Sequence, residues 1–132
     1  LPMETIHVDF TGSVHISERA VAVVAAVTTL QIPAVVSLGG NLAQGVAAKL
    51  GRSNPAKGVD VVLDEGAVDM TIRLVVRYGC RIPDVALQVQ KAVKDAVETM
   101  TGYAVTAVHI VIQDVDFTSE NAEAERGQED DE

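Results

Sequence analysis

The residues whose side chains could bind a metal or attack a substrate are few and widely separated in this chain. No two of its three histidines, His7, His15 and His109, stand three or four residues apart, the spacing that brings two ligands to one helix face. Cys80 is the single cysteine, which excludes both a multi-thiolate metal site and an intrachain disulfide. We therefore expect no metal and no cofactor.

Two further patterns have catalytic chemistry but lack the partners that catalysis needs. Asp114 and Asp116 form an Asp-x-Asp pair, which on a strand would suit a divalent cation or acid–base work. The pair ends an apolar run beside an acidic tail, so a solvated strand end is the preferred interpretation. Arg77 and Arg81 near Cys80 could make the thiol reactive, but no orienting residues accompany it. We expect no enzyme.

Six basic residues could together form a surface that binds an acidic partner. Several lie in the glycine-rich stretch 39–58, which has no acidic residue and matches neither the phosphate loop nor G-x-G-x-x-G. Such a set could bind an acidic peptide, an anionic membrane surface, or the acidic tail of a neighbouring copy. Asp69 shares a strand face with two of them, and a third lies just past the end of that strand, so an ordinary mixed surface is the preferred interpretation. The candidate interaction residues are Lys49, Arg52, Lys57, Arg73, Arg77 and Arg81.

The net charge of −9 is concentrated at the carboxyl end. Residues 118–132 hold seven acidic residues and one arginine, which leaves −3 for residues 1–117. Such a chain repels a nucleic-acid backbone, and with two Phe, two Tyr and no Trp it offers little surface for base stacking. We expect residues 1–117 to form one domain with an aliphatic core, and residues 118–132 to be a disordered acidic tail.

No segment predicts export or membrane insertion. The longest apolar run, residues 20–27, is well short of the roughly 18–20 residues that cross a bilayer. The first residues lack a basic region followed by an apolar run, and a single cysteine suits a reducing compartment. A cytoplasmic location is expected.

The residues that follow Ser17 predict a first helix. Ser17 is a suitable N-cap, Glu18 suits the first turn, and Pro33 ends the helix near Gln31. This helix is apolar nearly all round over residues 20–27. One face must cover a sheet. The other is either an alanine surface that costs nothing in water or a second burial surface against another subunit.

The remaining elements predict the fold class. Alternating residues around a turn at 64–66 indicate a hairpin, and Pro83 and Gly102 bound a second helix with one apolar stripe. With a short edge strand at residues 5–10, they predict an α+β fold: a small, mostly antiparallel sheet with two main helices packed on one face. In the last strand, residues 105–117, one face is expected to hold Val108, Ile110 and Ile112, and the other Val105, Ala107, His109 and Val111.

Six segments form a recognisable pattern. They read G-S-V-H-I-S-E-R-A-V at 12–21, A-A-V at 25–27, K-G-V-D-V at 57–61, V-V-R-Y-G-C-R-I-P-D-V-A at 75–86, V-Q-K-A-V-K-D-A-V-E-T-M-T-G-Y at 89–103, and V-T-A-V-H-I-V-I-Q-D-V-D-F at 105–117. The combination resembles the alkaline shock protein 23 family of bacterial envelope-stress proteins. Pro33-Ala34 departs from that pattern, which often has an acidic residue and glycine there.

The resemblance, which covers residues 12–117, carries expectations about function. It implies a non-enzymatic protein of the cell-envelope stress response or envelope homeostasis, with no catalytic residue to transfer. It also implies a homo-oligomer, and a small membrane-anchored partner that holds the protein at the inner face of the cell membrane. The opening strand and the acidic tail lie outside the shared pattern.

Two other functions compete with this one. The first is a small RNA- or nucleic-acid-binding α+β module that uses the basic loop 49–57. The net charge and the missing G-x-x-G clamp argue against it. The second is an enzyme that depends on Cys80 or on the aspartate pair, and the absence of orienting partners argues against that.

Overall fold

The computed structural model of the chain describes residues 5–6, 11–39 and 57–118. The α+β class predicted from the sequence is confirmed. The elements in chain order are β1 (Thr5–Ile6), β2 (Val14–His15), α1 (Glu18–Leu30), β3 (Val35–Leu38), β4 (Val59–Asp64), β5 (Ala67–Arg77), α3 (Ile82–Thr101) and β6 (Ala104–Asp116).

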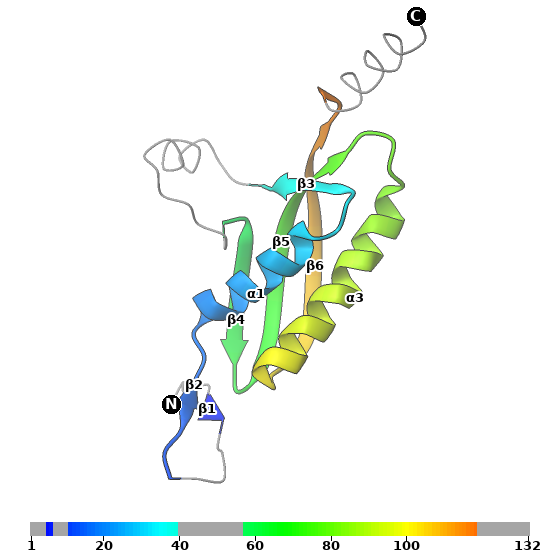
Figure 1. The fold of residues 1–132 in the computed structure, drawn as a ribbon. Coiled ribbons are helices and arrows are strands. Elements are labelled where there is room, and N and C mark those ends of the chain that lie inside the picture. Colours follow the sequence, from blue (N-terminus) through cyan, green and yellow to red (C-terminus); the bar gives the residue numbers. More distant parts are fainter. Residues whose placement is uncertain (1–4, 7–10, 40–56, 119–132) are drawn as a thin grey trace, which may run out of the picture.

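β5 is the central strand of the main sheet (Figure 1). β6 pairs with it in parallel along one edge, while β4 and then β3 pair with it antiparallel along the other. The sheet is therefore mostly antiparallel, as expected. The parallel pair arises because α3 carries the chain from one end of the sheet back to the other between β5 and β6.

A two-residue turn joins β4 to β5. Glu65 and Gly66 both have positive φ, 52° and 80°. This backbone matches the right-handed twist of the flanking strands, so it favours a tight hairpin. The predicted hairpin is confirmed, and its helix-side pairs are Val59 with Ile72, Val61 with Met70, and Leu63 with Val68.

Both helices lie on one face of the sheet and pack against each other. α1 begins after Ser17, whose Oγ accepts a hydrogen bond from Ala20 N at 3.0 Å. α3 ends at Gly102, which adopts the left-handed conformation with φ 80°. These are the boundaries that the two residues predicted.

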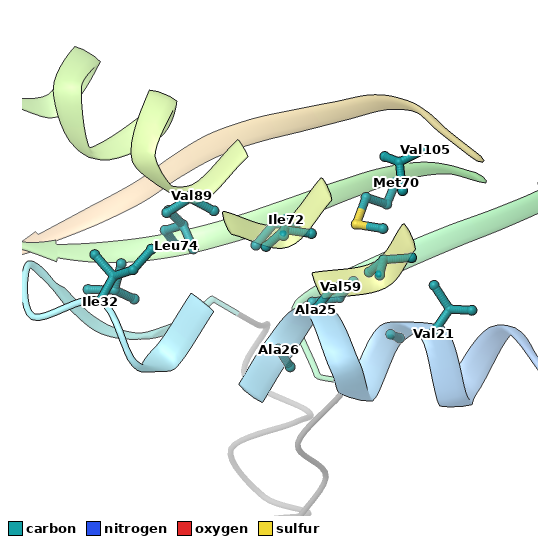
Figure 2. Close-up of a cluster of buried hydrophobic side chains, with 14 of the residues drawn as sticks. Val21, Ala25, Ala26, Ile32, Val59, Met70, Ile72, Leu74, Val89 and Val105 are labelled. Atoms are coloured by element: carbon teal, nitrogen blue, oxygen red, sulfur yellow. The ribbon is translucent and has the colours of Figure 1, made fainter. Parts of the chain in front are cut away.

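The core between sheet and helices is aliphatic. Figure 2 shows this cluster, with Val21 and Ala25 of α1 on one side of Ile72 and Met70 of β5 and with Val89 of α3 in the same layer of side chains. Each of these five side chains has 0% exposed surface. Removal of such apolar surface from water is the main force that holds helices and sheet together.

Two β-bulges in β6 correct one part of the sequence prediction. The register with β5 skips Thr106 and Gln113. Because an extra residue shifts the alternation of side chains, Val105 lies on the helix-covered face and is 7% exposed, whereas we expected it on the opposite face. The other residues lie as predicted: Val108, Ile110 and Ile112 on the helix side, and Ala107, His109 and Val111 on the open face.

β1 lies outside the main sheet. It pairs antiparallel with β2 in a separate two-stranded sheet, and the sequence pattern did not predict β2. Of the expected edge strand at residues 5–10, residues 7–10 lie outside the described residues. So do residues 40–56, with most of the basic stretch, and residues 119–132 of the expected tail.

Candidate interaction surfaces

α1 carries apolar residues on the side opposite the core. Ala20, Val23, Val27 and Leu30 recur at steps of three, four and three residues, the spacing of a helix–helix seam. Val27 and Leu30 are each 45% exposed, Ala20 is exposed and Val23 is half-buried. We call these four residues the α1 seam. An alanine surface accounts for Ala20 but not for the larger side chains.

The orientation of α1 is fixed by contacts with the rest of the fold. At its first turn, Glu18 Oε2 accepts a hydrogen bond from Leu63 N of β4 at 3.3 Å. On its inner side Val21 is fully buried, and the buried Thr29 hydroxyl donates to the Ala25 carbonyl oxygen at 2.8 Å. These contacts bury one side of the helix, so the seam is left with exposed apolar surface.

The two candidate arginines of β5 lie on the open face of the sheet. Arg73 Nη1 forms an ion pair with Asp60 Oδ2 of β4 at 2.6 Å. Arg77 Nη2 donates to the Pro33 carbonyl oxygen at 3.4 Å, and Arg77 stands opposite Asp116 in the register. Carboxylates therefore accompany these arginines, which makes this face one of mixed charge.

The other candidate basic residues lie elsewhere. Arg81 is the residue before α3, and its Nε lies 3.3 Å from Asp84 Oδ2 in an exposed pair. Lys57 is half-buried in the turn before β4. Lys49 and Arg52 lie outside the described residues. Among the described candidates, Arg73 and Arg77 share the open face of β5, whereas Lys57 and Arg81 lie outside that strand.

Residues with metal or nucleophile chemistry form no metal-binding cluster in the described part of the chain. No three His, Cys, Asp or Glu side chains there are grouped so that they could hold a metal ion. His109 Nε2 lies 3.4 Å from Asp69 Oδ1. Asp114 and Asp116 accept hydrogen bonds from backbone amides one and two residues on, at 2.8 Å and 2.9 Å. Cys80 is a half-buried free thiol. Local strand and turn structure accounts for the aspartates.

The outer edge of β6 is a feature that the sequence analysis missed. Gln90 Nε2 donates to the Val108 carbonyl oxygen at 3.0 Å, and Val105 N donates to Glu98 Oε2 at 2.9 Å. Lys94 Nζ binds the same Glu98 oxygen at 2.8 Å. The hydrogen bonds from Lys94 and from Val105 N lower the pKa of Glu98. Side chains of α3 thus cover the first part of this edge, where an open hollow of about 200 Å³ lies beside them.

Comparison with known proteins places this chain in a family. The model of the alkaline shock protein 23 family, whose description is a cell envelope-related function, matches residues 7–117. The chain belongs to the alkaline shock protein 23 family. The resemblance seen in the motifs of residues 12–117 is thereby confirmed, and so is an envelope-related role at the level of the family. Among the described residues, no helix combines the length and apolar character needed to cross a membrane.

The relatives found for this chain come from bacteria and match it over most of its length. Uncharacterized protein YqhY of Bacillus subtilis (strain 168) is 29% identical over 89% of this chain and 87% of its own length. Uncharacterized protein Spy1535 of Streptococcus pyogenes serotype M6 is 30% identical over 81% of each chain. Uncharacterized protein YloU of Bacillus subtilis is 29% identical over 82% of this chain and 92% of its own. No solved structure matches significantly.

Proposed function

We propose that this member of the alkaline shock protein 23 family is a non-enzymatic protein of cell-envelope homeostasis that self-associates and is recruited to the membrane by a small anchoring partner. The envelope-related function of the family supports the location of its work. The exposed apolar side chains and the mixed charges of the described surface support a role in binding.

The observation that carries the proposal is the α1 seam. Val27 and Leu30 remain 45% exposed although their neighbours on the same helix are buried. Covering each of them with an apolar helix of the partner would stabilise the complex by about 1 kcal/mol, because apolar surface leaves water. The seam spacing fits one such helix laid along α1.

Charge favours a partner over direct adsorption to lipid. The inner leaflet of a cell membrane is anionic and attracts polybasic segments. This chain has a net charge of −9, and each β5 arginine lies near a carboxylate or a carbonyl oxygen. Recruitment at the inner face of the membrane therefore rests on a protein anchor in this proposal.

Fractionation of cells that produce tagged variants tests recruitment. The wild type is expected in the membrane fraction, and the double variant Val27→Lys, Leu30→Lys in the supernatant, because two charges would be buried in the docked seam. Val62→Lys is the matched control, since Val62 is 61% exposed on β4 and far from the seam in the fold. Circular dichroism melts must show that all variants are folded. A folded seam variant that stays with the membrane would contradict the proposal.

Sedimentation velocity across a wide concentration range tests self-association separately. The purified wild type is expected to shift toward larger species as concentration rises. A strict monomer at every concentration would remove self-association from the proposal and leave the recruitment experiment to be judged alone.

A further inference from the structure

β6 is an edge strand whose outer side changes character along its length. It pairs with β5 on one side, and no other strand of the described chain pairs with it. Backbone groups of a strand point alternately to its two sides. Because the Val108 carbonyl points outward to Gln90, the amides and carbonyls of Ile110 and Ile112 also point outward. No described residue hydrogen-bonds these outward groups of Ile110 and Ile112.

The polar cover from α3 ends just before this uncovered stretch. Gln90, Lys94 and Glu98 lie along the side of α3 that faces residues 105–108. One turn earlier on that side stands Leu87, which is 50% exposed. α3 and β6 run in opposite directions, so a step of about 4.5 Å along the helix brings Leu87 near the level of Ile110. An apolar residue thus replaces the polar cap where the edge is bare.

The bare stretch has a composition suited to pairing. Residues 109–113 read His-Ile-Val-Ile-Gln, with no Asp, Glu, Lys or Arg. Val111 is 44% exposed on the open face of the sheet. An unpaired edge rich in β-branched residues is a template for another strand. Two identical copies of this stretch can therefore meet without a pair of like charges. Pairing farther along β6 would bring the acidic residues Asp114 and Asp116 of the two copies together.

We infer that two copies of the protein pair through β6, antiparallel about a two-fold axis at Val111. In this register Ile110 of each copy faces Ile112 of the other, and their outward groups exchange hydrogen bonds. Centring on Ile110 would require the Val108 carbonyl, which Gln90 already occupies. Centring on Ile112 would place the acidic Asp114 opposite Ile110. The result is one sheet that continues across both copies.

The size of this contact sets its strength. A ladder of about five residues on each side buries less than the roughly 800 Å² per partner of a standard stable interface. The dimer is therefore expected to be weak and to form at high concentration. The inference rests on the self-association in the proposed function and specifies where it occurs, while the α1 seam stays free for the anchoring partner.

A charge introduced at residue 111, on the two-fold axis, tests the inference. In a non-hydrogen-bonded pair the two Val111 Cβ atoms would stand about 4.5–5.5 Å apart. Val111→Lys and Val111→Glu should each abolish dimer formation in sedimentation velocity, because like charges then face each other. An equimolar mixture of the two should restore the dimer. Val62→Lys, on the far edge of the sheet, should associate like the wild type.

A crosslinking experiment checks the register independently of stability. In a Cys80→Ser background, Val111→Cys should form a disulfide-linked dimer under mild oxidation, while Val62→Cys should remain monomeric. Wild-type association that persists in folded Val111→Lys would overturn the edge inference and leave self-association standing. A wild type that is monomeric at every concentration would overturn both.

Discussion

Gly58 is the residue before β4, and it lies against Leu38 and Gly39 at the end of β3. Its φ is +90°, and a Cβ there would clash with the carbonyl oxygen of Gly39. Gly58→Ala therefore combines backbone strain with a clash against another backbone, and we expect the free energy of unfolding to fall by about 2 kcal/mol or more. Urea unfolding followed by circular dichroism measures it.

Gly66 provides the matched control for Gly58. It also has positive φ, +80°, but a Cβ there would meet nothing within 4 Å. Gly66→Ala is expected to cost about 1 kcal/mol, the strain term alone. Equal losses in the two variants would show that the contact with the Gly39 carbonyl adds nothing.

Glu98 gives the fold a dependence on pH. The hydrogen bonds from Lys94 and from the Val105 amide lower its pKa in the folded state. A carboxyl group with a depressed folded pKa stabilises the fold above its unfolded pKa, and this contribution is lost as pH falls through the folded pKa. Glu98→Gln should therefore be less stable than the wild type at pH 7, and the gap should shrink below about pH 4.3, the pKa of an unperturbed Glu.

The measurement for Glu98 is chemical unfolding of both proteins from pH 7 to pH 3. A gap between wild type and Glu98→Gln that stays constant through this range would contradict the predicted role of the carboxylate. The same variant keeps the amide oxygen as an acceptor for Val105 N, so it isolates charge from hydrogen bonding.

At the scale of elements, the beginning of α1 depends on one hydroxyl. Ser17 Oγ accepts from Ala20 N at 3.0 Å, so one otherwise unpaired amide of the first turn is satisfied. Ser17→Ala should lower the free energy of unfolding by about 1 kcal/mol. Ser13→Ala removes an exposed hydroxyl outside the helix and should change it by less than about 0.5 kcal/mol. A Ser17→Ala melt identical to that of the Ser13 control would contradict the capping role.

Local signals explain which elements the sequence could predict. Ser17 and Gly102 mark helix ends through chemistry that acts within one turn, so they were readable without the fold. Val105 was assigned to the wrong face because the bulge at Thr106 shows itself only in the register with β5. The hydrogen bonds of Gln90 and Glu98 with β6 were missed for a similar reason. The sequence pattern of a helix shows that a side chain is polar, but it does not show whether that side chain faces water or the edge of a strand.

At the scale of the molecule, order along the chain did not determine order in the sheet. The sequence predicted a hairpin and a final strand. The parallel placement of β6 beside β5 depends on where α3 returns the chain to the sheet. That placement is what makes β6 an edge strand and α3 its neighbour. The α1 seam was foreseeable from apolar residues all round one helix, whereas the β6 edge required the topology.

The acidic end of the chain should oppose the pairing of two copies. Residues 118–132 carry −6 of the net charge of −9, so like charges approach when copies associate. A chain that ends at Thr118 should therefore dimerise more tightly than the full chain at low salt. The difference should shrink toward 1 M salt, where screening acts within about 3 Å. Sedimentation velocity at both salt levels measures this, with thermal melts expected to be unchanged. Weaker association of the shortened chain would reverse the interpretation and indicate that the acidic residues bind arginines of the neighbouring copy.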